Sequence, residues 1–267
     1  MLKKTFFAVL LIGLLLGGTK IQPAKAASVT ALADIEAGDL IRGESFSAVY
    51  YYGEDGFRYV FPNDRTYFTW FDDFDDVRWI SDADLGKIQI GGNVTYKPGI
   101  KMIKINTDPK VYAINEGGEL WWVSTESAAV ALYGSNWNTK IDDVPDGFFS
   151  NYTRTSEEIT GLDDFNPTVV EGSTSDIGED KGLIEAYDVE ITDNDYSEGS
   201  ITIEVGQTVR FTNNGDNKHT ATGDDGEWGS GTVSADGGFW TRRFDEAGIY
   251  TFYCSYHPSM SGTIIVE

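Results

Sequence analysis

Short runs of alternating apolar and polar residues are the main pattern along this chain, and they predict β-strands rather than long helices. Such runs occur between residues 27 and 152, where Tyr, Trp and Phe are frequent, and again between 184 and 267. The segment between them, 153–183, is polar and acidic and has few apolar groups to offset the entropy of ordering. We therefore predict a mainly β protein with domains at 27–152 and 184–267, joined by an acidic flexible linker at 153–183.

The first of these domains contains a weak internal repeat at a constant offset of 62 residues. Each copy has a strand, a glycine turn and a second strand, at 48–52, 55–56 and 57–61 in the first copy and at 110–114, 117–118 and 119–123 in the second. Asp-Gly and Gly-Gly allow the positive φ of tight turns, so each copy predicts an aromatic-rich β-hairpin. A short helix is expected after each hairpin, at 66–71 and 126–133, and a third hairpin between 94–96 and 101–105.

Residues 1–26 have the pattern of a secretory signal peptide. Lys3 and Lys4 precede an apolar run at 6–16, and Ala24-Lys25-Ala26 provides a small-x-small cleavage site. The run is shorter than the roughly 20 residues that span a bilayer, and no second candidate follows. We expect export to the periplasm, the cell surface or the extracellular space, with no stable membrane span after cleavage. A retained N-terminal anchor is the alternative.

The chain is strongly acidic, with 20 Lys and Arg against 43 Asp and Glu and a net charge of −23. Cleavage after residue 26 would remove four lysines, leaving 16 basic against 43 acidic residues, a net charge of −27. This charge argues against binding to nucleic acid or to anionic lipid through basic residues. It suits attraction to a basic protein partner, and it equally suits an organism whose proteins work in high salt.

Residues 27–152 contain no histidine and no cysteine, which removes His-based and thiol catalysis from this domain. The acidic clusters at 72–76 and 142–143 lack the spacing of a calcium loop and are better explained as solvated loops. The aromatic residues form either a core or a face that binds an envelope component or a protein. The sequence assigns no chemistry to this domain.

The two histidines and the single cysteine of the chain all lie after residue 218. Cys254, His257 and Met260 follow one another at intervals of three, and His219 stands 35 residues before Cys254. Two imidazoles, a thiolate and a weak thioether are the donor set of a blue copper site, because they serve both oxidation states of copper. Zinc would need a fourth strong ligand. A buried structural Cys or a satisfied His explains either residue alone, but not their collection in one segment.

Residues 184–267 resemble the cupredoxins, the type 1 blue copper proteins. The Cys-x-x-His-x-x-Met loop before the strand at 262–266 is most similar to the amicyanin and halocyanin branch, whereas plastocyanins usually have a longer His-to-Met loop. Segments 205–209, 214–220 and 244–254 also resemble the family. Lys218 departs from it, because many relatives have proline there.

The resemblance implies an antiparallel Greek-key β-sandwich with one copper ion near one end. His219, Cys254 and His257 would be its strong ligands and Met260 its weak axial ligand. The expected function is the transport of single electrons between redox protein partners. The protein would not be an enzyme, since four protein ligands leave no open coordination position.

Two alternatives to a simple electron carrier remain open. In the first, residues 27–152 bind a partner or the cell surface and the cupredoxin is a tethered redox head. In the second, the protein stores or delivers copper, a task for which an open, methionine-rich site is better suited than a closed one.

Overall fold

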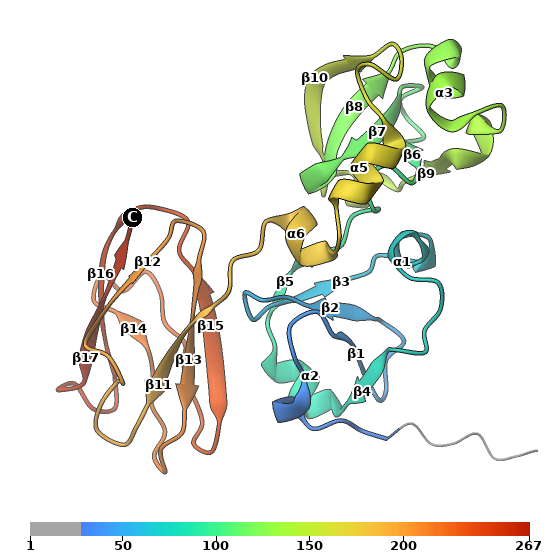
Figure 1. Cartoon of the computed structure of the whole chain (residues 1–267). Coiled ribbons are helices and arrows are strands. Elements are labelled where there is room, and N and C mark those ends of the chain that lie inside the picture. Colours follow the sequence, from blue (N-terminus) through green and yellow to red (C-terminus); the bar gives the residue numbers. More distant parts are fainter. Residues whose placement is uncertain (1–27) are drawn as a thin grey trace, which may run out of the picture.

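The computed structural model describes residues 28–267, so the predicted signal peptide at 1–26 lies outside the described residues (Figure 1). Within that range the chain forms four β-sheets, two with five strands, one with three and one with four. The prediction of a mainly β protein is confirmed. Over the same residues, no helix is both long enough and apolar enough to cross a membrane.

The first two sheets belong to the two copies of the sequence repeat. The first copy contains β1 (Leu40–Gly43), β2 (Tyr50–Tyr52), β3 (Arg58–Val60), α1 (Asp64–Trp70), β4 (Arg78–Ile80), α2 (Asp82–Lys87) and β5 (Ile90–Asn93). The second contains β6 (Met102–Lys104), β7 (Val111–Asn115), β8 (Glu119–Val123), α3 (Glu126–Tyr133), β9 (Ile141–Asp143), α4 (Asp146–Phe149) and β10 (Thr153–Ile159). Short 3₁₀ turns occur at Leu32–Asp34, Glu116–Gly118 and Trp137–Lys140.

Both copies have the same topology. The strand order is β4-β1-β2-β3-β5 in one sheet and β9-β6-β7-β8-β10 in the other. In each copy the central hairpin is antiparallel and both edge strands pair in parallel. The repeat is therefore a whole domain and not only a hairpin, so the single domain expected at 27–152 is in fact two.

The sequence signals for the hairpins and helices agree with the observed elements. Tyr50 pairs with Val60 in the first hairpin, and Val111 with Val123 in the second. Each helix begins after a residue whose side chain accepts a backbone N–H, Asn63 before α1 and Thr125 before α3. The third hairpin was a wrong prediction, because 94–96 forms no strand and β6 belongs to the second sheet.

The segment 153–183 is not the extended tether that its composition predicts. β10 is an edge strand of the second sheet, and it is followed by α5 (Pro167–Ser173) and α6 (Ile177–Lys181). A few apolar side chains hold this segment against the two copies. Ile159 and Phe165 are buried in the core of the second copy, and Ile177 is buried in the core of the first. Most of the remaining polar residues are exposed on an edge strand, in loops or on short helices, which explains the misleading composition, while Thr174 and Asp180 are buried.

Residues 187–266 form a sandwich of a three-stranded and a four-stranded sheet. Its strands are β11 (Tyr187–Ile191), β12 (Ser200–Ile203), β13 (Thr208–Asn213), β14 (Thr222–Gly223), β15 (Gly238–Arg243), β16 (Gly248–Tyr253) and β17 (Ser261–Val266). Their orders are β11-β13-β15 and β12-β17-β16-β14, so the chain crosses repeatedly between sheets. The pairs β11–β13 and β12–β17 are parallel, so the expectation of a wholly antiparallel sandwich is wrong there.

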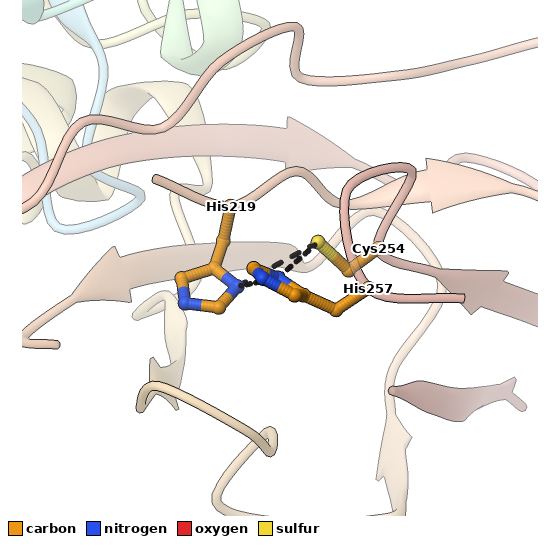
Figure 2. A group of neighbouring side chains, drawn as sticks. All are labelled: His219, Cys254 and His257. Atoms are coloured by element: carbon orange, nitrogen blue, oxygen red, sulfur yellow. Dashed lines mark hydrogen bonds between the residues drawn. The ribbon is translucent and has the colours of Figure 1, made fainter. Parts of the chain in front are cut away.

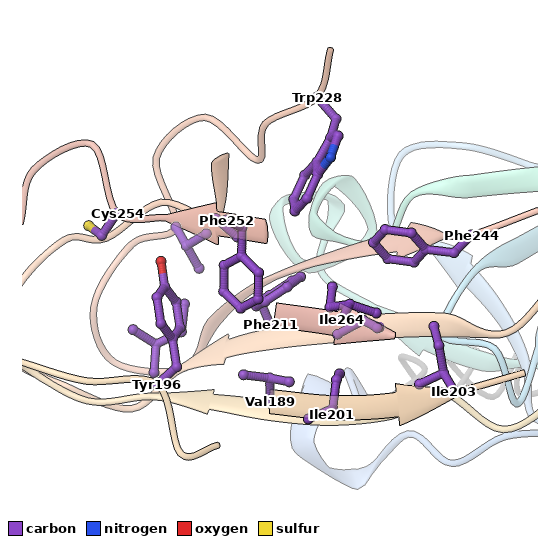
Figure 3. Packing of buried hydrophobic residues seen from close by; sticks show 14 of the residues in the cluster. Val189, Tyr196, Ile201, Ile203, Phe211, Trp228, Phe244, Phe252, Cys254 and Ile264 are labelled. Carbon is purple, nitrogen blue, oxygen red and sulfur yellow. The ribbon is translucent and has the colours of Figure 1, made fainter. Parts of the chain in front are cut away.

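Aromatic and β-branched side chains from both sheets fill the space between them (Figure 3). Phe211 and Phe252 meet edge to face with ring centroids 5.2 Å apart, and Tyr196 packs on Phe252 at 4.8 Å. Cys254 lies at one end of this core, beside Tyr196 (Figure 3). The packed core therefore supports the thiol at one edge of the sandwich.

The sandwich lies beside the first copy (Figure 1), and a cluster of polar side chains joins the two. Asp55 in the turn between β2 and β3 is 1% exposed, and its carboxylate accepts hydrogen bonds from Arg243 and from the Tyr59 hydroxyl. The Thr208 hydroxyl donates to the Asp55 carbonyl at 2.8 Å. Asp55 of the first copy therefore bonds to residues of the sandwich, which fixes the sandwich and its candidate copper site on the first copy.

Candidate metal centre

Two loops at one end of the sandwich carry the candidate ligands. His219 lies between β13 and β14, where its backbone exchanges hydrogen bonds with Val233 at 3.1 and 2.8 Å. Cys254 follows the last residue of β16, and His257 and Met260 lie in the turn before β17. Within that turn His257 N donates to Cys254 O, and Cys254 N donates to Met260 O. Both loops are thus held by main-chain bonds.

The structure brings together His219, Cys254 and His257, as the sequence predicts (Figure 2). The two Nδ1 atoms are 3.2 Å apart, and the Cys254 Sγ is 3.6 Å from Nδ1 of His219 and 3.7 Å from Nδ1 of His257. A triangle with these edges has a circumscribed radius of about 2.0 Å, close to the metal–nitrogen and metal–sulfur distances of about 2.0–2.3 Å. The three donor atoms therefore fit one metal ion without rearrangement.

The fourth candidate, Met260, is 2% exposed and belongs to the sandwich core. Its backbone closes the ligand loop through a 2.9 Å hydrogen bond from Met260 N to His257 O. Two nitrogens, one thiolate and a thioether from the same loop suit copper better than zinc, because zinc favours four strong ligands.

Burial differs between the two histidines. His219 and Cys254 are both 0% exposed, whereas His257 is half-buried and is flanked by the exposed residues Tyr256 and Pro258. Burial, together with the neighbouring His257, lowers the pKa of His219 and favours its neutral form, which is the form that binds a metal. His219 Nε2 has no hydrogen-bond partner among the described residues, so packing and the backbone bonds to Val233 orient the ring.

The residue that follows the first histidine organises the centre, and sequence reasoning missed it. The Thr220 backbone N–H donates to the Cys254 Sγ at 3.4 Å. Its hydroxyl oxygen accepts from Ser255 N at 2.8 Å, and its carbonyl accepts from the Tyr196 hydroxyl at 2.5 Å. Thr220 thus joins both ligand loops to the core. The sequence shows that Thr220 is next to His219. It does not show the hydrogen bond, because every residue except proline has a backbone N–H.

The loop before His219 is held by Asn213, which is 0% exposed. Its side-chain amide donates to the carbonyls of Asn217 and Val233, and its side-chain oxygen accepts from Gly215 N. The Asp193 carboxylate accepts from the backbone N–H groups of Asp216 and Asn217. These bonds lower the pKa of Asp193, so the loop is braced by a carboxylate that stays ionised at neutral pH.

Lys218 replaces the proline expected from the resemblance, and it does not disturb the geometry. Its ammonium lies 4.3 Å from the centroid of the Tyr256 ring, and the Tyr256 hydroxyl bonds to the Thr232 hydroxyl at 2.8 Å. A cation–π contact and a hydrogen bond therefore fix Tyr256 beside His257. This places one positive charge at the rim of an otherwise acidic domain.

Comparison with known sequences finds copper-binding proteins that match the segment containing the candidate ligands. The sequence model of the copper binding proteins of the plastocyanin/azurin family matches residues 185–267. A plastocyanin from Scenedesmus fuscus is 32% identical over 84 residues, covering 27% of this chain and 86% of the plastocyanin.

Solved structures of similar proteins include a purple cupredoxin from Nitrosopumilus maritimus and an amicyanin from Paracoccus versutus. The first is 26% identical, covers 30% of this chain and 99% of its own, and has a TM-score of 0.28. The second is 33% identical, covers 31% and 81%, and also has a TM-score of 0.28.

Proposed function

Since the chain belongs, through residues 185–267, to the plastocyanin/azurin family of copper-binding proteins, we propose that it is an exported carrier of single electrons. The observation that carries the proposal is the triangle of His219 Nδ1, His257 Nδ1 and Cys254 Sγ, which accepts one ion about 2.0 Å from each atom. His219, Cys254 and His257 would hold a copper ion, whose +1 and +2 states would allow one electron to pass from a donor to an acceptor.

The protein residues would keep this exchange fast by holding the donor atoms still. His219 and Cys254 are fixed by backbone bonds to Val233 and Met260, and Thr220 N donates to the sulfur. Met260 would supply a weak thioether donor from the same loop as Cys254 and His257. A site that is already arranged for both oxidation states needs little reorganisation on electron transfer.

We propose that electrons enter and leave at His257, because it is the one strong ligand that reaches the surface. Tyr256 and Pro258 flank its edge and are uncharged, and the Lys218 ammonium against the Tyr256 ring is the positive charge at this rim. The ligand set has no open position for a substrate, which favours a carrier over an enzyme. A closed, mostly buried site also favours electron transfer over copper storage or delivery.

The proposed export rests on the signal-peptide pattern at 1–26. N-terminal sequencing of the protein recovered from the culture medium or the periplasm should begin at Ala27. Retention of residues 1–26 in a membrane fraction would instead support the N-terminal anchor.

The net charge of −27 after cleavage suits a basic redox partner and equally suits adaptation to high salt. In the first case, the rate of electron exchange with a basic protein acceptor should fall steeply as ionic strength rises past about 0.1 M, where the Debye length is about 10 Å. Rates that are flat or rise with salt, with thermal stability increasing into the molar range, would indicate adaptation to high salt instead.

The test of the central proposal is the visible spectrum of the full chain loaded with copper. A copper–thiolate bond gives an intense blue or green colour, and cyclic voltammetry should show one reversible one-electron wave. Cys254→Ser should abolish the colour while circular dichroism still shows the folded sandwich. An intense colour that survives Cys254→Ser would overturn the assignment.

A further inference from the structure

The two copies of the repeat each contain a cavity at the same place in the fold. The cavity of the first copy, about 450 Å³, is lined by positions 47–49, 60–64 and 67, and that of the second, about 300 Å³, by 109–111, 122–126 and 129. These positions correspond at the repeat offset of 62. Phe74 and Trp137 extend the match at an offset of 63, as do β4 and β9. The cavity is therefore a property of the fold between the central hairpin and the following helix.

The first cavity is an open hollow with aromatic residues and one charged residue in its lining. Phe61 and Tyr67 are buried and their rings meet at 5.0 Å, while Phe74 stacks on Tyr67 at 4.3 Å. Phe74 is 47% exposed, and Phe148, from α4 of the second copy, is 36% exposed. Asp64 is the one charged residue in the lining, and no basic residue faces it there. Aromatic faces and a carboxylate together attract a cation.

The second cavity already has an ammonium group in its wall. Lys110, part of this lining, places its ammonium 4.5 Å from the centroid of the Trp122 ring. The carboxylate residue at the equivalent of Asp64 is Glu126. The second copy thus provides its own cation, the ammonium of Lys110.

The first copy lacks that internal cation. Ala48 stands at the position of Lys110, and Val60 at that of Trp122. Exposed aromatic surface is provided instead by Phe148, which has no aromatic equivalent in the second cavity, and by Phe74, the counterpart of Trp137. The lining of the first cavity therefore contains aromatic residues and a carboxylate but no Lys or Arg. A cation bound there would come from another molecule.

We infer that the cavity of the first copy binds an organic ammonium group, and that the Lys110 ammonium is the counterpart of this group in the wall of the second cavity. The size fits a small-molecule site, which usually measures about 300–1,000 Å³. The net negative charge of the chain adds long-range attraction for a cation. The ammonium group is either that of a free quaternary amine or that of a lysine side chain on a partner.

The test is a titration of the full chain followed by amide NMR shifts, and it is independent of copper binding. Choline and Nα-acetyl-lysine methylamide are the probes, and their neutral counterparts are 3,3-dimethyl-1-butanol and the Nε-acetylated lysine derivative. At least one cationic probe should shift amides at 60–64 and bind at least about fivefold more tightly than its neutral counterpart. Tighter binding of choline would indicate a quaternary amine, and tighter binding of the lysine derivative would indicate a partner lysine.

Variants separate the two cavities. Asp64→Asn and Phe74→Ala should each weaken binding at least about threefold, while Phe46→Ala, which changes an exposed ring outside the cavity, should not. Lys110→Ala should make the amides at 122–126 respond to the same probe, whereas in the original chain they should not respond. Equal binding of the neutral counterparts, no shift with either probe at 50 mM, or no new response in Lys110→Ala would overturn the inference.

Discussion

The backbone N–H of Thr220 donates a hydrogen bond to the Cys254 Sγ across 3.4 Å, joining the loop of the first histidine to the loop of the thiolate. A donor at this sulfur withdraws electron density from it, which stabilises reduced copper relative to oxidised copper. The bond lies on the main chain, so most substitutions at position 220 would preserve it.

Thr220→Pro removes this donor and should lower the reduction potential. His219 is in an extended β-bridge, as a residue before proline must be. A net contribution of about 1 kcal/mol for one hydrogen bond corresponds to roughly 40 mV for a single electron. Cyclic voltammetry measures the shift, and Thr220→Val, which keeps the N–H, serves as the control. An unchanged potential in Thr220→Pro would show that the bond does not tune the copper.

Met260→Leu should keep copper bound and raise the reduction potential, because a thioether stabilises oxidised copper more than an alkyl group does. We expect a rise of more than about 59 mV, a tenfold change in the one-electron equilibrium. Met102→Leu changes another buried methionine, remote in the second copy, and should leave the potential unchanged. Loss of copper from Met260→Leu, or an equal potential in both variants, would contradict an axial role.

Arg243→Ala should loosen the sandwich from the first copy. Asp55 would lose its cation at a site that is 1% exposed, although the Tyr59 hydroxyl would still bond to it. A cost of about 1–3 kcal/mol should lower the melting temperature by roughly 5 °C in calorimetry. Lys104→Ala breaks a more exposed ion pair with Asp143 and should cost less than about 1 kcal/mol. The copper colour should survive in both variants, and equal melting temperatures would exclude a stabilising interface.

Asp180 should make the protein more stable as the pH falls from 7.5 to 5. Burial raises the pKa of this carboxyl from 3.8 to about 6, so the folded state takes up a proton in a range where the unfolded state does not. The contribution is complete below the unfolded pKa and is lost as the pH rises through about 6. Asp180→Asn should remove it, which changes the stability difference between the two proteins by about 1 kcal/mol over this range. If the melting temperatures of both proteins changed with pH by the same amount, the effect would be refuted.

The ligand set was accessible to sequence reasoning because its chemistry requires rare residue types. With two histidines and one cysteine in the whole chain, their grouping after residue 218 left few other arrangements. The hairpins of the repeat were also accessible, since glycine turns and alternating strands are local signals. α3 begins and ends where the sequence predicts it, because Thr125 caps it and Gly134 follows it.

The acidic segment 153–183 shows where composition fails. Ile159, Phe165 and Ile177 are three widely separated apolar residues, too sparse to predict a folded segment, yet each enters a core formed by distant strands. The partner strand of β10 is β8, and the buried partners of Ile177 include Tyr51. Such anchorage depends on surfaces that the local sequence does not contain.

The sequence by itself determined the type of metal centre, the repeat and the mainly β architecture, because rare ligands and alternating patterns are properties of residue type and spacing. The tertiary structure alone decided that the repeat is two complete domains, that Asp55 joins the first of them to the sandwich, and that Thr220 N faces the Cys254 sulfur. The last two depend on contacts between segments 188 and 34 residues apart. Packing between distant surfaces and the direction of a backbone N–H are fixed only when the whole chain has folded.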